Sequence, residues 1–177
     1  MMLQNRYPLG QGTHLGDGLN SQVELDTDKL KECSCGLVEN GLVVARVAVL
    51  LISPAGVQEI CAAEHSADVR LENHVVQAAM RACVEKHLGP VLRLVNLETW
   101  EHMAGHGFAP RILDLAVRQF APVDSLLVVN AKPIDGREAR TSDKKLALFY
   151  ERRGFKKPRE LATLMTRTWT GPQDTLR

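Results

Sequence analysis

Three stretches of the chain carry the hydrophobic pattern of β-strands. Residues 42–52 are a long run of mainly Val, Ala and Leu, residues 91–99 alternate between apolar and polar positions, and residues 125–130 are an almost unbroken apolar run. Runs of this length that are rich in β-branched residues are typical of strands inside a sheet. Residues 161–169 alternate less regularly and predict the last strand, and residues 57–62 are a candidate partner strand that follows a Pro-Gly turn.

Apolar residues at helical spacing predict four helices between these strands. They lie at residues 26 or 27 to 35, 66 to 88, 111 to 120 and 144 to 150. Pro110 suits the first turn of the third helix, because the N–H that proline lacks is not needed there. We expect Asp143 to cap the fourth helix and Gly154 to end it.

The alternation of strands and helices predicts an α/β protein with a mixed central sheet covered by helices. A chain of 177 residues is long enough for one packed domain and too short for two of ordinary size. Residues 1–24 contain several glycines and little apolar periodicity, so we expect an irregular N-terminal arm there. Residues 25–177 are then a single domain.

Composition excludes several classes of function. The 22 basic and 21 acidic residues give a net charge of +1, so no global field favours nucleic acid. The sequence contains neither an apolar stretch long enough to span a membrane nor the pattern of a signal peptide, and we expect a cytoplasmic protein without membrane contact. Its four cysteines are too irregularly spaced for a disulfide scaffold or a zinc site, so free thiols and no metal are expected.

A glycine-spaced turn, residues 104–109, precedes the third predicted helix. Gly105 and Gly107 let the backbone approach a ligand closely, and the unpaired N–H groups of the helix N-terminus favour an anion. A tight turn with helix capping needs the same glycines, so this loop alone leaves both interpretations open.

The order of motifs between residues 91 and 155 narrows the choice. A Gly-x-Gly-x-Ala loop, a helix, a strand that ends in Asn130 and the sequence Leu-x-x-Phe-Tyr-Glu-x-x-Gly-Phe follow one another. This order resembles the acetyl-CoA-binding half of the GCN5-related N-acetyltransferase superfamily. The resemblance implies a mixed sheet that is splayed in the middle, with helices on both faces, and acetyl-CoA as co-substrate. Ala104 stands where the superfamily has Gln or Arg, which implies weakened cofactor binding.

The resemblance also implies roles for individual residues. Glu98 falls where the superfamily often has a general base, and Tyr150 matches the tyrosine that donates a proton to the departing thiolate. The residues expected to bind the cofactor are Thr99, Trp100, Gly105, His106, Gly107, Phe108, Ala109, Arg111 and Asn130. Two alternatives stay open, since Glu98 would also fit a solvated strand face and Tyr150 would also fit the edge of the core.

The function expected from the resemblance is the transfer of an acetyl group from acetyl-CoA to an amine of a small molecule or a protein. An alternative is a degenerate member that serves as a binding or regulatory module for a protein partner, which Ala104 and the atypical N-terminal half favour. A weaker third possibility is a plain α/β domain whose loop binds nothing. A homodimer is left open, and the acceptor cannot be inferred.

Overall fold

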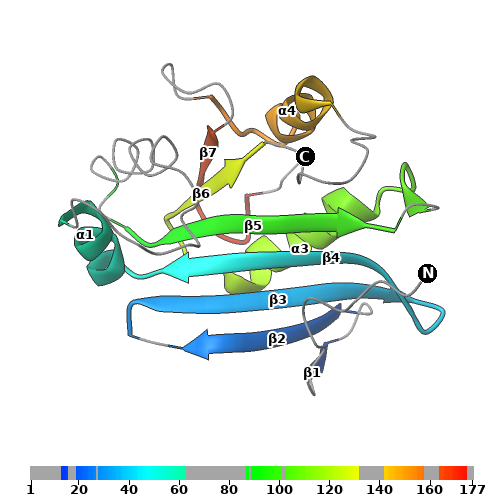
Figure 1. Cartoon of the computed structure of the whole chain (residues 1–177), viewed down its shortest axis with the longest axis horizontal. Helices are drawn as coiled ribbons and strands as arrows, with labels where there is room; N and C mark the ends of the chain where they lie inside the picture. The colour runs from blue at the N-terminus through cyan, green and yellow to red at the C-terminus, as the bar shows by residue number, and fades with distance from the viewer. Residues whose placement is uncertain are drawn as a thin grey trace.

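A seven-stranded mixed sheet forms the centre of the protein (Figure 1). The computed structural model describes residues 13–15, 19–26, 28–62, 87, 89–100, 103–131, 142–157 and 164–174. The strands are β1 (Thr13–Leu15), β2 (Leu19–Asp26), β3 (Leu30–Glu39), β4 (Leu42–Ile52), β5 (Val91–Thr99), β6 (Ser125–Asn130) and β7 (Leu164–Trp169), and they lie side by side in chain order. Only β5 and β6 pair in parallel; the other neighbours are antiparallel. The predicted α/β class with a mixed sheet is confirmed.

A tight hairpin connects the two longest strands, β3 and β4. Asn40 and Gly41 both have positive φ, at 51° and 76°. Two consecutive residues of this kind are the signature of a type I′ turn, whose twist matches the twist of the flanking strands. The hairpin therefore fixes the register that places the side chains of Cys33, Cys35 and Leu37 beside those of β4.

Helix α3 (Phe108–Phe120) is the crossover between the parallel strands β5 and β6, and Figure 1 shows it behind the sheet. Its buried residues Ile112, Leu113, Ala116 and Val117 recur at helical spacing and pack against β3, β4 and β5. The other described helices are α1 (Pro54–Ala62), which follows β4, and α4 (Asp143–Glu151), which follows β6. None of the described helices is long and apolar enough to cross a membrane.

The central strands are buried on both faces. The face toward α3 includes Cys33, Val47, Val49, Leu92 and Leu127, and these side chains form one cluster with the helix. The opposite face is closed as well near α1. There the buried side chains are Ala48, Leu50, Ile52, Val91, Leu126 and Val128. Because β4 is buried on both faces along most of its length, its sequence is an apolar run that only Arg46 interrupts.

Two cysteines of β3 belong to this core. Cys33 and Cys35 are free and buried, as expected for thiols outside a disulfide scaffold. Burial, with a smaller contribution from the neighbouring Cys33, raises the pKa of the Cys35 thiol to about 12. Cys35 is therefore a packed, protonated side chain at neutral pH rather than a nucleophile.

The structure differs from the sequence prediction in the first third of the chain. The short helix predicted over residues 26 or 27 to 35 is wrong, because β3 occupies these positions. Apolar residues at 33, 35 and 37 have the period of two, and Gly36 disfavours a helix. Strands β1 and β2 also lie in the region expected to be an irregular arm, whereas the division into an arm and a domain stays a prediction.

Two further local predictions are corrected. The turn and strand expected over residues 53–62 are helix α1, in which Pro54 is the first residue and the hydroxyl of Ser53 accepts a hydrogen bond from the N–H of Gly56 at 3.2 Å. The cap of α4 is Ser142 rather than Asp143, and its side chain accepts from the N–H of Lys145.

Other predicted elements agree with the structure or fall outside it. The strands predicted at residues 42–52, 91–99 and 125–130 are confirmed. The last predicted strand, residues 161–169, is confirmed over its described part, β7, while residues 161–163 lie outside the described residues. Helix α3 begins three residues before its predicted start. The long helix predicted from Ser66 lies outside the described residues, and so does any cover that it would give to the second face of the sheet.

The packing of α3 gives a testable prediction. We expect Leu113→Ala to lower the free energy of unfolding by about 2–5 kcal/mol, because Leu113 is fully buried and its truncation leaves a cavity. The same change at Leu42, which is 65% exposed, should alter stability by less than about 0.5 kcal/mol. Urea denaturation of both variants measures the difference, and equal losses would contradict the described core.

Candidate functional site

Strands β5 and β6 separate halfway along the sheet. Their parallel pairing runs from Val91 opposite Leu126 to Leu94 opposite Val129 and then stops, although β5 continues to Thr99. Figure 1 shows the two strands pointing in different directions beyond this point. We call the space between residues 95–99 of β5 and the end of β6 the fork.

A β-bulge marks the start of the fork. The register of β5 against β4 shifts between Leu94 and Asn96, so that Val95 has no partner on β4. A bulge bends its strand and increases the local twist, which turns the end of β5 away from β6. The end of β5 stays attached to β4, where Thr99 lies opposite Ala45.

The fork offers backbone hydrogen-bonding groups and apolar surface together. Among the described strands, none pairs with the β6-side edge of residues 96–99. Free strand edges bind extended chains that carry amide groups. Val95 and Trp100 are 44% and 41% exposed at the two ends of this segment. An elongated ligand with amides and apolar portions would therefore suit the fork.

The N-terminus of α3 lies beside the open end of β5. Gly105 and Gly107 have φ values of 86° and 79°, and no atom lies within 4 Å of the position where either would carry a Cβ. Gly107 is the N-cap, so no side chain caps the first turn. The N–H groups at this helix end and their partial positive charge are thus available to an anion. The ring of His106 stacks on that of Phe108.

Arg111, a predicted cofactor residue near the start of α3, forms an ion pair with a residue of β3. Its guanidinium forms an ion pair with Glu39 at 3.1 Å, and both side chains are exposed. The pair connects the first turns of α3 to the β3–β4 hairpin. An anionic ligand at the helix end would compete with Glu39 for Arg111.

Polar side chains gather on the face of β5 that points away from α3. Asn96 donates a hydrogen bond from Nδ2 to Oε1 of Glu98 at 2.9 Å, and Arg46 lies directly opposite Glu98 on β4. Asn130, at the end of β6, belongs to the same face by strand alternation. The side-chain oxygens of Asn96 and Asn130 are buried, and within the described part of the chain they have no hydrogen-bond partner.

Tyr150 is held in the core by α4. It is 3% exposed and contacts Phe149 and Phe155 with its ring edge-to-face, at centroid distances of 5.0 and 5.4 Å. Burial raises the pKa of the Tyr150 hydroxyl well above its ordinary value, and nearby Arg153 only partly opposes this. The phenol is therefore neutral at physiological pH. Tyr150 lies deeper than the edge of the core, and its role stays a prediction.

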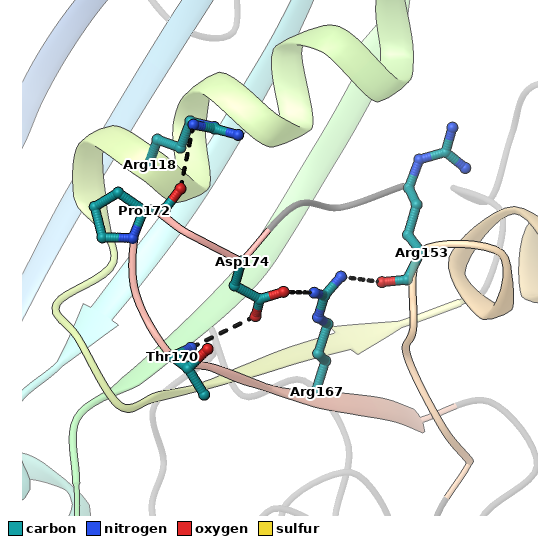
Figure 2. Close-up of polar contacts among 6 residues, drawn as sticks. All are labelled: Arg118, Arg153, Arg167, Thr170, Pro172 and Asp174. Carbon is teal, nitrogen blue, oxygen red and sulfur yellow. Dashed lines mark hydrogen bonds and ion pairs between the residues drawn. The ribbon is translucent and has the colours of Figure 1, made fainter.

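The end of α4 is fixed by a network that involves the C-terminal strand (Figure 2). Arg167 of β7 donates to the carbonyl of Arg153 and forms an ion pair with Asp174. Asp174 in turn accepts from the N–H of Thr170. Figure 2 shows the guanidinium of Arg153 pointing away from Arg167; it lies over the ring of Phe149, 3.8 Å from the centroid. The turn after Tyr150 is thus held on two sides.

A basic pocket of about 320 Å³ lies on another side of α4. The side chains that line it are Lys145, Leu148, Phe149, Arg152 and Arg153. Within the parts of the chain that the structure describes, no group of three or more His, Cys, Asp or Glu side chains could hold a metal ion.

The structure brings most of the predicted site residues together. Glu98, Thr99, Trp100 and the loop through Ala109 follow one another from the end of β5 into α3, and Asn130 ends the neighbouring strand. Tyr150 follows on the next helix. Sequence reasoning missed Asn96, although its position two residues before Glu98 on a predicted strand places both on one face.

Comparisons with known proteins give weak similarities. No protein-family model matches the sequence, and no curated protein sequence matches it. The chain is similar to the apo crystal structure of an agmatine N-acetyltransferase mutant, with a TM-score of 0.47 and 11% identity over 76% of this chain and 74% of that one. It is similar to SsHAT with a TM-score of 0.38 and 14% identity over 77% and 71% of the two chains. TM-scores below 0.5 do not establish a shared fold, so the function of the chain is inferred from its own geometry.

The network at the end of α4 gives a second prediction. We expect Arg167→Gln to lower the free energy of unfolding by about 2–3 kcal/mol, because it leaves Asp174 and the carbonyl of Arg153 without a charged donor. Arg118→Gln is the matched control, because its ion pair with Asp114 is exposed and should contribute less than about 1 kcal/mol. Chemical denaturation of both variants tests this, and a smaller loss for Arg167→Gln than for Arg118→Gln would refute it.

Proposed function

We propose that this protein transfers an acetyl group from acetyl-CoA to an amine. The observation that carries the proposal is the fork, which opens at the bulge of β5 beside the glycine-capped N-terminus of α3. A ligand that combines an extended arm with amides, a pyrophosphate and a thioester matches this arrangement. The order of motifs from residue 91 to 155 resembles the N-acetyltransferase superfamily and supports the same conclusion.

The main chain would hold most of the cofactor. The free edge of residues 96–99 would pair with the amides of the pantetheine arm, and Val95 and Trp100 would cover its apolar portions. The N–H groups that begin α3 would bind the pyrophosphate. Ala104 supplies no side-chain contact where the superfamily has Gln or Arg, so we expect weaker binding than in its typical members.

Glu98 would act as general base, directly or through a water molecule. An alkyl amine has a pKa of about 10.4, so its free form at pH 7 costs about 5 kcal/mol. The neutral amine attacks the thioester carbonyl, a C–N bond forms, and the C–S bond breaks as the thiolate leaves. Glu98 takes the proton that the amine nitrogen loses, and positioning supplies much of the remaining acceleration.

Tyr150 would donate a hydrogen bond to the leaving thiolate. Its raised pKa keeps it protonated, as this role requires. A thiol has a pKa of about 8.5 and a free tyrosine one of about 10, so complete proton transfer to the thiolate is uphill by at least about 2 kcal/mol. Tyr150 would therefore stabilise the thiolate by its hydrogen bond and leave protonation to the solvent.

The pocket on α4 favours a second candidate function. Lys145, Arg152 and Arg153 surround the half-exposed Leu148, and this combination of charge and apolar surface suits an acidic protein segment. A member of the fold without chemistry would bind such a partner there. Acetyl transfer without dependence on this pocket would separate the two functions.

Cofactor binding is tested with a matched pair of glycine variants. Acetyl-CoA at 100 times its dissociation constant should add about 2.7 kcal/mol to the unfolding free energy, which is about 5–11 °C for a chain of this size. Gly107→Ala and Gly41→Ala impose similar strain of about 1–2 kcal/mol, because both positions have φ near 80° and open surroundings. Only Gly107→Ala should reduce the shift caused by acetyl-CoA in a thermal unfolding assay.

The outcomes of this assay are distinct. If millimolar acetyl-CoA does not shift the thermal midpoint of the wild-type protein, the proposed function is wrong. If Gly107→Ala and Gly41→Ala reduce the thermal shift of the wild-type protein equally, the cofactor does not bind at the N-terminus of α3.

The role of Tyr150 has a separate test. Tyr150→Phe keeps the ring contacts with Phe149 and Phe155 and removes the hydroxyl. We expect the rate of thioester cleavage in the presence of an amine to fall by about 10²-fold or more, while the thermal shift with acetyl-CoA stays unchanged. Release of free thiol measures the rate. Full activity of the variant would assign Tyr150 to packing alone.

A further inference from the structure

Two buried carboxamide oxygens beside the fork lack the partner that buried polar atoms need. The Oδ1 atoms of Asn96, on β5, and Asn130, at the end of β6, are shielded from solvent, and among the described residues neither has a hydrogen-bond donor. A buried acceptor without a donor destabilises the folded protein. Both atoms are acceptors, so a ligand that satisfies them must carry N–H or O–H donors.

The orientation of the Asn96 amide is fixed by its neighbour. Nδ2 of Asn96 donates to Oε1 of Glu98 at 2.9 Å. A rotated amide would place its oxygen against the carboxylate oxygen, and two acceptors repel each other. Asn96 therefore holds Glu98 with its nitrogen and must present its oxygen to another group.

The residues across β4 from this pair do not supply the missing donor. Across β4 from Asn96 is Ala48, whose side chain is small, and Arg46 lies across from Glu98. Arg46 and Arg93, on the same face, already interact with other groups. Guanidinium groups could donate to the Asn96 oxygen, but these two have other partners. The oxygen without a donor therefore indicates a ligand site.

We propose that the side-chain oxygen of Asn96 binds the amine nitrogen of the acceptor substrate. Asn96 and Glu98 then form one unit, in which Asn96 positions the carboxylate with Nδ2 and accepts an N–H of the amine with Oδ1. The substrate class is a primary or secondary amine, since a quaternary nitrogen has no N–H to donate. The inference rests on the proposed function, because it assigns the acceptor side of the same site.

The two probes share a butyl chain and a positive charge at pH 7.5, and the second carries three methyl groups in place of the N–H donors of the first. Butylamine and butyltrimethylammonium are titrated into the ¹⁵N-labelled protein at pH 7.5 with CoA present, and the side-chain amide signals of Asn96, assigned with the Asn96→Leu variant, are followed by NMR. We expect butylamine to shift these signals with saturation and butyltrimethylammonium to leave them in place. Equal shifts with the two probes, or no shift with butylamine, would overturn the inference; the latter result would assign the oxygen to bound water.

Substitutions at residue 96 add a second readout. Asn96→Leu should raise the dissociation constant of butylamine, followed through the backbone amide signals of residues 95–99, by about tenfold or more. The thermal midpoint should change little, because the substitution removes an unpartnered buried acceptor together with the part-buried hydrogen bond to Glu98. Asn96→Asp keeps an oxygen acceptor but loses the Nδ2 donor to Glu98, so we expect it to retain butylamine binding that Asn96→Leu loses, and an equal loss in both variants would contradict the proposal. Unchanged binding by Asn96→Leu would contradict the proposal; if that variant does not fold, the two probes on the wild-type protein and Asn96→Asp decide it.

Failure of this inference and failure of the proposed function give different results. If acetyl-CoA shifts the thermal midpoint but butylamine does not perturb the Asn96 signals, the proposed cofactor site is supported and the proposed amine site is contradicted. If butylamine perturbs the Asn96 signals but acetyl-CoA gives no thermal shift, the amine site is supported and the proposed function is contradicted.

Discussion

The arrangement of the whole site depends on the point where β5 stops pairing with β6. Only four residue pairs hold these parallel strands together, and the bulge at Val95 then turns β5 away. Because α3 is the crossover between the same two strands, its N-terminus must lie at the end of β5 that has just been released. A single bulged residue therefore brings an unpaired strand edge and a helix N-terminus to one place.

The rest of the sheet holds this opening in place. Strand β4 is buried on both faces and stays paired with β5 to its end, so the released edge of β5 is supported from one side. On the face away from α3, the apolar half around Leu50 and Val91 gives way to a polar half with Asn96 and Glu98. The change from mainly apolar to polar side chains falls near the bulge at Val95. Stability therefore comes mainly from one half of this face, and the other half is free to carry polar groups.

The sequence predicts the elements whose pattern is local and strong. Strands β4, β5 and β6 are long apolar or alternating runs, and α3 has a clear helical stripe, so these were predictable. The sequence predicts a helix at residues 26 or 27 to 35, where β3 begins, because the alternation of apolar and polar residues in β3 is short and its polar residues favour neither state. The sequence around the N-terminal strands is rich in glycine, at positions 10, 12, 16 and 18, and this pattern predicts a loop. The pairing of β2 with β3 is a tertiary effect that the local pattern does not show.

The candidate site was predictable where it is contiguous in sequence. Residues 98–109 follow the end of β5 directly, so their proximity follows from the strand prediction. The divergence of β5 and β6 was expected only from the resemblance, which implies a sheet splayed in the middle, because neither the length of the β5–β6 pairing nor the bulge at Val95 has a sequence signal of its own. The burial of Tyr150 was equally hidden, since it depends on Phe155 and on packing against distant strands. The unpaired oxygen of Asn96 becomes visible only when every hydrogen bond around it is known.

The contact between Arg167 and the end of α4 also has a consequence for how the protein is made. Helix α4 emerges from the ribosome before β7, and the turn that follows Tyr150 gains its anchor only when Arg167 and Asp174 have been synthesised. The N-terminal strands and the β3–β4 hairpin can pair much earlier, because their contacts are local. The nascent chain would thus build its sheet first and complete the aromatic side of its site last.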